Sequence, residues 1–122
     1  TDVTGFSLAG HSLEMAKGSG KTLVIHSGKL PVMDGVVEYA QMGLVPEGAY
    51  RNREFAGAAI RSEIRELWKE DVVFDPQTSG GLLLAVPSDE ADQLAAELGK
   101  MDISGGIIGT VTELQDKYVI FD

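Results

Sequence analysis

Apolar residues at the start of the chain recur with a spacing near 3.6, which is typical of one face of an amphipathic helix. This pattern predicts a helix from about Gly5 to Ala16, ended by the glycine-rich turn at residues 18–20. Thr4 stands directly before the helix, and threonine is a favoured N-cap residue. The positions that we expect to form the buried stripe of this helix are Phe6, Ala9, Leu13 and Ala16.

Three later stretches also carry helical spacing. One covers residues 31–42 and opens with a proline, which is well placed in a first turn. Another is marked by apolar residues at i, i+4, i+7 and i+8 from Ile60. The last begins with Ser88 as its expected N-cap and ends at Gly99, whereas residues 43–58 lack a clean period and predict a loop-rich connection. The expected inward-facing residues are Met33, Val37, Ala40, Ile60, Ile64, Leu67, Trp68, Ala91, Leu94, Ala95 and Leu98.

Short apolar runs between these helices predict strands. Residues 21–26 include a β-branched run suited to a buried strand. Residues 82–86 are almost continuously apolar, as in a strand that is buried on both faces. Two runs at 107–114 and 118–121 flank a polar turn at 115–117 and predict a hairpin. Helices that alternate with strands and a hairpin together predict layered α/β architecture with a sheet that is not purely parallel.

Composition narrows the class of protein. The chain has 122 residues, which predicts a single domain over residues 1–122. Its formal net charge of −9 argues against a nucleic-acid partner, because phosphate backbones attract basic surfaces. No apolar run approaches the ~20 residues of a membrane span, and no signal peptide is recognisable at the start. Because the chain begins without methionine inside a motif, we expect a piece of a longer protein.

The absence of cysteine excludes several kinds of site within this chain. With no cysteine there are no disulfides, no thiolate metal ligands and no thiol catalysis. The two histidines, His11 and His26, lack zinc-binding spacing, so a structural or solvent role is expected for each. No Ser-His-Asp constellation can be assembled from the sequence.

The first residues carry the most suggestive chemistry. The segment that leads into the first predicted helix contains Thr1, Asp2, Thr4 and Gly5, and the unpaired N–H groups of a helix start favour phosphate. The Asp2 carboxylate could hold a hard cation such as Mg²⁺, which commonly bridges to nucleotide phosphates. The alternative is that Asp2 or Thr4 merely caps the helix. Residue types alone leave both interpretations open.

A second polar segment, residues 75–81, ends in two glycines before an apolar run. Its side chains Gln77, Thr78 and Ser79 either line an active-site cleft or form a tight connection whose hydroxyls satisfy backbone groups. We expect the segment to be mainly architectural.

Two other features allow more than one role. Arg51 and Arg53 lie in the densest cationic spot and could contact phosphate, but they could equally belong to a solvated loop. Trp68, the only tryptophan, is expected to anchor the core rather than to stack on a base.

Residues 1–6 with Gly10-His11, and later residues 75–83, resemble two signature segments of selenophosphate synthetase (selenide, water dikinase) in the family's order. Residues 48–52 also fit. The likeness covers the whole chain but only the C-terminal half of the enzyme. Two positions depart from the usual pattern: Ser7 replaces a glycine, and Ala9 replaces a leucine.

This resemblance implies an α+β fold, a three-layer α/β/α sandwich with a mixed sheet, like the C-terminal domain of aminoimidazole ribonucleotide synthetase. It implies an enzyme that makes selenophosphate, AMP and phosphate from ATP, selenide and water. Asp2 would be the carboxylate that this domain adds to the Mg²⁺ cluster. Thr1, Thr4 and Gly5 would shape the phosphate end of the cleft.

By the same resemblance, the remaining machinery lies in the N-terminal half, including a reactive Cys or selenocysteine, a catalytic Lys and most metal-binding aspartates. We therefore expect no catalytic residue here, an inactive isolated fragment, a full-length homodimer and a cytoplasmic location. The alternatives are a domain of aminoimidazole ribonucleotide synthetase, thiamine-monophosphate kinase or a hydrogenase-maturation protein, or a non-enzymatic interaction module.

Overall fold

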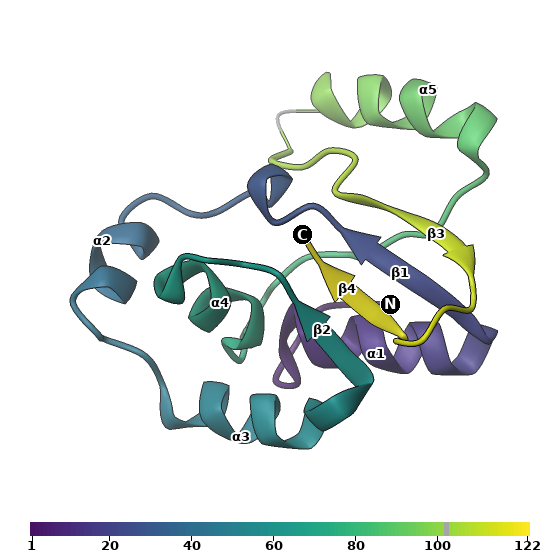
Figure 1. Ribbon diagram of the computed structural model, residues 1–122. Helices are drawn as coiled ribbons and strands as arrows, with labels where there is room; N and C mark the ends of the chain where they lie inside the picture. The colour runs from purple at the N-terminus through teal and green to yellow at the C-terminus, as the bar shows by residue number, and fades with distance from the viewer. Residues whose placement is uncertain (102) are drawn as a thin grey trace.

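The computed structural model describes residues 1–101 and 103–122. Its centre is a four-stranded sheet of order β2-β4-β1-β3 (Figure 1). β1 pairs antiparallel with β3 and parallel with β4, which in turn pairs parallel with β2, so the sheet is mixed. The strands are β1 (Lys21–Ile25), β2 (Ile60–Ser62), β3 (Gly109–Glu113) and β4 (Val119–Phe121).

The predicted C-terminal hairpin is wrong, because β1 lies between β3 and β4, the two strands that the hairpin would have paired. The polar connection crosses the end of β1 and is fastened there by one buried hydroxyl. Thr22 Oγ1 donates to Lys117 O at 2.6 Å and accepts from Gln115 N at 2.8 Å. These bonds replace the direct pairing of a hairpin.

The first helix, α1 (Ser7–Ser19), starts later than predicted. Thr4 is not its cap: Phe6 occupies the N-cap position, without a side-chain hydrogen bond. Ala9 and Leu13 are buried as expected, but Phe6 is 50% exposed. The chain turns before the helix instead of continuing into it, since Thr4 O accepts hydrogen bonds from Ser7 N and Gln77 N.

Two predictions between residues 31 and 58 fail. The helix expected over residues 31–42 shrinks to α2 (Val36–Gln41), because Gly35 adopts φ 81°, which α-helical backbone cannot accommodate. Met33 is 79% exposed. The expected loop contains α3 (Glu47–Ala56). The buried positions of α3 are small or polar, namely Ala49, Asn52 and Ala56.

The helix expected from Ile60 is also displaced. Residues 60–62 form β2, since Ile60 is held opposite Val119 of the neighbouring strand. The helix α4 (Leu67–Phe74) follows, and its buried residues are Val73 and Phe74 rather than Trp68. Trp68 is only half-buried, so it does not anchor the core.

The apolar run at 82–86 forms no regular strand. It is joined to residue 2 by one antiparallel bridge, Asp2 to Leu82. Leu83 is buried, whereas Leu82 and Leu84 are 73% and 53% exposed, so the run is buried on one side only. The last predicted helix is confirmed as α5 (Ser88–Gly99), with Pro87 rather than Ser88 at the N-cap position.

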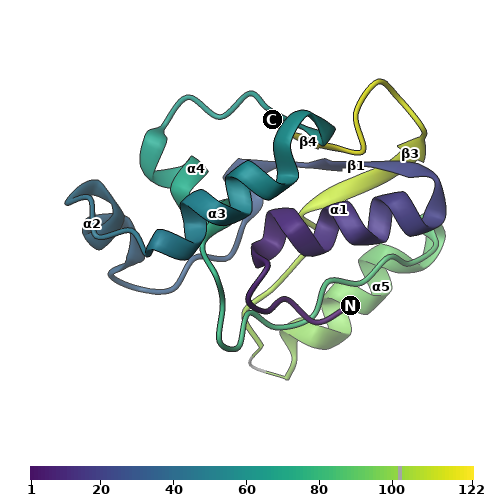
Figure 2. The ribbon, with the colours of Figure 1, turned by 90° about the horizontal axis from the view of Figure 1, so that it is seen from below.

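The class predicted from the sequence, α+β with a mixed sheet, is confirmed. Figure 2 shows α1 along one face of the sheet with α3 beside it. Leu13 of α1, Val73 of α4, and Leu23, Val119 and Phe121 of the sheet share one core between these layers. Among the described residues, no helix combines the length and apolarity required to cross a membrane. Two short 3-10 turns complete the elements, η1 (Ser27–Lys29) and η2 (Gly57–Ala59).

Candidate functional site

The two signature-like segments lie side by side. Thr1 and Leu83 exchange backbone hydrogen bonds of 3.0 and 2.8 Å. Val3 N donates to Gly81 O at 2.9 Å, and Gly80 N donates to Val3 O at 3.0 Å. A Cβ on Gly80 would lie 2.7 Å from Val3 O, so this approach requires glycine. The second segment is thus the backbone support of the first, as its expected architectural role requires.

Asp2 lies on the outer side of this support, whereas the Thr4 hydroxyl contacts the buried ring of His11. Val3 between them is buried in the core, and alternate side chains of extended backbone point to opposite sides. Asp2 is exposed and Thr4 is half-buried. Neither side chain caps α1 in the described structure, because Phe6 occupies the N-cap position and no side-chain cap bond is present.

The metal-binding capacity of this site is limited to one carboxylate. Within residues 1–101 and 103–122, no group of three or more His, Cys, Asp or Glu side chains could hold a metal ion. The exposed oxygens of Asp2 fit the preference of Mg²⁺ for oxygen, but a single carboxylate fills only part of an octahedral shell. Asp2 fits a cation site that other groups complete.

Thr4 belongs to a chain of hydrogen bonds that the sequence did not reveal. Its Oγ1 lies 2.9 Å from His11 Nε2, and His11 Nδ1 lies 3.0 Å from Glu14 Oε2. His11 is only 9% exposed. The i, i+3 spacing of His11 and Glu14 was a signal for their contact, but only the turn at residues 4–7 brings Thr4 to the ring.

Ser7, one of the two departures from the family pattern, has unusual backbone geometry. Its φ is 71°, the one positive value among the described non-glycine residues. It is fully buried, and its hydroxyl donates to the carbonyl of Phe6. Left-handed backbone favours glycine, so the serine is strained where the family usually has glycine.

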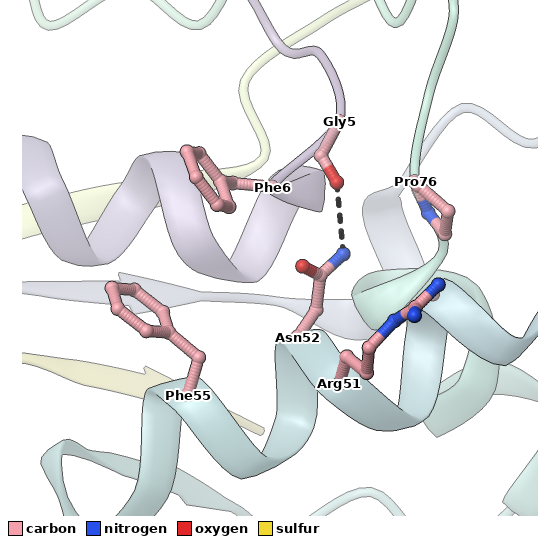
Figure 3. Close-up of a pocket in the computed structure, with 7 residues that line it drawn as sticks. Gly5, Phe6, Arg51, Asn52, Phe55 and Pro76 are labelled. Atoms are coloured by element: carbon pink, nitrogen blue, oxygen red, sulfur yellow. Dashed lines mark hydrogen bonds between the residues drawn. The ribbon is translucent and has the colours of Figure 1, made fainter.

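A cavity of about 530 Å³ adjoins Gly5 and is drawn in Figure 3. Asn52 of α3 reaches across it, and its Nδ2 donates to Gly5 O and Phe74 O, both at 3.0 Å. The rings of Phe6 and Phe55 stack with centroids 5.8 Å apart. The lining residues are Gly5, Phe6, Gly48, Arg51, Asn52, Phe55 and Pro76.

The two arginines of the cationic spot have different surroundings, and both lie on α3 rather than in a loop. Arg51 is exposed at the rim of the cavity and lies 3.6 Å from Glu47. Arg53 pairs with Asp71 at 3.0 Å and lies over the Phe74 ring. Arg53 is therefore a structural link between α3 and α4, which leaves Arg51 as the cation that faces the cavity.

The polar turn after α4 is held by its own side chains. Gln77 Nε2 donates to Asp75 Oδ2 at 2.6 Å, while Thr78 and Ser79 are exposed. Burial raises the pKa of the Asp75 carboxyl above its usual value, and the hydrogen bond from Gln77 partly opposes this shift. His26 has a structural role, since its Nδ1 lies 2.9 Å from Asp122 Oδ1 at the carboxyl ends of the central strands β1 and β4.

Comparisons with known proteins identify the family of this chain. A family model described as "AIR synthase related protein, C-terminal domain" matches residues 1–122. The chain is 44% identical to a protein named "Selenide, water dikinase" from Clostridium botulinum (strain Eklund 17B / Type B), over 98% of this chain and 35% of that protein. It is 42% identical to "Selenide, water dikinase 2" from Peptoclostridium acidaminophilum, with the same coverage.

A protein named "Selenide, water dikinase" from Nitratidesulfovibrio vulgaris (strain DSM 19637 / Miyazaki F) is 49% identical over 81% of this chain and 29% of its own length. The chain thus spans about a third of the length of the relatives that it matches. The resemblance to selenophosphate synthetases seen in the signature segments is confirmed. Since the family model covers the whole chain, this protein belongs to the family of AIR synthase related proteins, as their C-terminal domain.

Proposed function

We propose that this chain is the C-terminal domain of a selenide, water dikinase, which converts ATP, selenide and water into selenophosphate, AMP and phosphate. The names of the similar proteins support this assignment. The remaining two thirds of such a protein would supply the nucleophile, which is a Cys or selenocysteine in the family, and most of the metal-binding carboxylates. The whole enzyme would be a cytoplasmic homodimer.

The observation that carries the proposal is the placement of Asp2. Its carboxylate is exposed on a segment whose backbone is pinned to residues 80–83. An exposed oxygen pair on a fixed backbone suits one position in the shell of Mg²⁺. Bound Mg²⁺ would neutralise phosphate charge during phosphoryl transfer.

The chain's own contribution would be to bind and position. Asp2 would hold the cation, while Thr1, Thr4 and Gly5 would form the phosphate end of the cleft. The carbonyl of Gly5 is fixed by Asn52, which supports a rigid wall at this place. Exposed Leu82 and Leu84 beside Asp2 offer apolar surface to the protein's own N-terminal part.

The test compares the isolated chain with the same domain joined to its N-terminal part. We expect no selenide-dependent AMP formation from the chain alone, and turnover from the joined protein. Asp2→Asn in the joined protein should raise the Mg²⁺ concentration for half-maximal activity about tenfold or more, as loss of a metal-site group commonly does. Asp89→Asn is the matched control, because Asp89 is an exposed carboxylate in the first turn of α5.

Two results would contradict the proposal. Robust AMP formation by the isolated chain would show that the catalytic machinery is not elsewhere. An unchanged Mg²⁺ dependence in Asp2→Asn would remove Asp2 from the metal site.

A further inference from the structure

The backbone pairing between the two signature-like segments stops at Thr1, although residues 84–86 continue past it. Asp2 and Leu82 form an antiparallel bridge, and Thr1 and Leu83 exchange two backbone hydrogen bonds. Residues 84–86 exchange no backbone hydrogen bond with any other residue that the structure describes. We infer that, in the longer protein, the residues directly before Thr1 extend this ladder along residues 84–86.

The comparisons supply the strand that the extension needs. The matched family model describes a C-terminal domain, and the chain spans about a third of the length of its relatives. Figure 2 shows the N-terminus against the segment that leads into α5. The inference rests on this place of the chain in a longer protein and not on the reaction that we propose.

The existing pairs fix the register of the extension. In an antiparallel ladder, pairs that exchange two hydrogen bonds alternate with pairs that exchange none. Thr1 and Leu83 form a hydrogen-bonded pair, so Leu84 would face the residue directly before Thr1 without a bond between them. Ala85 would then exchange two hydrogen bonds with the second residue before Thr1.

Covalent continuity favours the protein's own chain over a second molecule at this edge. In the longer protein Thr1 N is a peptide nitrogen, and its single hydrogen is used by the 3.0 Å bond to Leu83 O. The preceding residue therefore begins beside Leu84. Two extended residues cover about 7 Å and reach Ala85, and so short a connection loses little chain entropy. A second molecule would first have to displace the chain itself.

The side chains of this segment also suit a covered outer face. Leu83 is buried on the core side, whereas Leu82, Leu84 and Val86 are 73%, 53% and 39% exposed. Alternate residues of extended backbone share one side, so the residue directly before Thr1 would lie on the outer side with Asp2, opposite Leu84. An apolar side chain there would cover Leu84, and such cross-strand pairs stabilise a ladder.

The extension has a consequence for Asp2. In the isolated chain Asp2 is one pair from the end of the ladder. The ends of paired segments open most readily. Added pairs before Thr1 would place Asp2 inside the ladder, so docking of the preceding residues would hold its backbone more firmly.

A disulfide tests the pairing directly. Antiparallel residues without hydrogen bonds between them have Cα atoms about 4.5 Å apart, which a disulfide can span. In the longer protein, Leu84→Cys combined with a cysteine in place of the residue directly before Thr1 should form an intramolecular disulfide, identified by peptide mass spectrometry. Ala85→Cys with the same partner is the matched control and should not form it, because its side chain leaves the opposite side of the strand.

The other outcomes of this experiment contradict the inference. A disulfide between two molecules would assign the edge to a second copy of the protein. An equal yield from Ala85→Cys would mean that the register is wrong, and no disulfide from Leu84→Cys would mean that the preceding residues do not pair here.

Amide exchange tests the ladder without a substitution. The Ala85 amide should exchange with solvent deuterium at least about tenfold more slowly in the longer protein than in the isolated chain, because it becomes a hydrogen-bond donor. Equal exchange in the two proteins would overturn the inference even if the cysteine variants failed to fold. Neither readout involves Mg²⁺ or turnover, so Asp2→Asn tests the proposed function separately.

Discussion

Asn52 Nδ2 donates to the carbonyl oxygen of Gly5 at 3.0 Å and so ties α3 to the segment that precedes α1 (Figure 3). The same nitrogen donates to Phe74 O at the end of α4. One buried amide therefore joins three parts of the chain that are far apart in sequence.

Removal of this amide should destabilise the domain. Asn52→Ala leaves the carbonyls of Gly5 and Phe74 without their donor in a site that is 8% exposed. We expect the free energy of unfolding to fall by about 2–3 kcal/mol, since each buried unsatisfied group costs about 1–3 kcal/mol. Urea unfolding followed by circular dichroism measures this loss. Gln93→Ala, on the exposed side of α5, should change stability by less than about 0.5 kcal/mol, and an equal loss in both variants would contradict the assigned role.

Replacement of Ser7 by glycine should stabilise the domain, because the backbone at this position favours glycine. Ser7→Gly relieves left-handed geometry that costs about 1–2 kcal/mol in other residues. Loss of the hydroxyl contact with Phe6 offsets part of this gain, so we expect a net stabilisation of about 1 kcal/mol. The matched control is Ser12→Gly, because Ser12 is also fully buried in α1 but in the helix interior, where glycine costs about 1 kcal/mol. Thermal unfolding should move the two melting temperatures in opposite directions.

The free energy of unfolding of the domain should depend on pH through Asp75, which lies in the polar turn after α4. Burial raises the pKa of this carboxyl in the folded state, so the protonated form favours folding. This contribution is complete below the usual value of 3.8 and is lost as the pH rises through the raised folded value. Asp75→Asn should therefore be more stable than the parent chain at neutral pH, and the difference should vanish in acid.

Urea unfolding at a series of pH values tests this sign. Asp92→Asn, at an exposed position of α5, supplies the matched control and should show no such convergence. A parent chain that becomes relatively more stable as the pH rises would overturn the argument.

Sequence periodicity located α1 and α5, displaced α4 and missed α3. The stripe of Ala9, Leu13 and Ala16 in α1 was predicted and is buried. The inner face of α3 consists of Ala49, Asn52 and Ala56, which carry almost no hydrophobic signal. A helix that is held by an amide and small residues cannot be recognised from hydrophobic spacing alone.

Strand pairing between residues far apart in the sequence explains the remaining differences between the predicted and the observed elements. Ile60 fits a helical pattern, yet it pairs with Val119, nearly sixty residues away, in the sheet. The terminal strands look like a hairpin until β1 is placed between them. At the proposed site, the sequence predicts roles for Asp2 and Thr4, but it did not predict the turn at residues 4–7 that brings Thr4 into contact with His11.

The approach of Gly80 to Val3 should control how firmly Asp2 is held. In Gly80→Ala the new methyl group would lie 2.7 Å from Val3 O and 2.9 Å from Val3 Cγ1, so the two segments must separate. Such overpacking typically costs about 1–3 kcal/mol. Because Val3 N donates to Gly81 O in the same pairing, its amide should also exchange faster with solvent deuterium. Gly106→Ala, where a Cβ meets nothing within 4 Å, is the control. Unchanged protection of the Val3 amide in Gly80→Ala would mean that the second segment does not support the first.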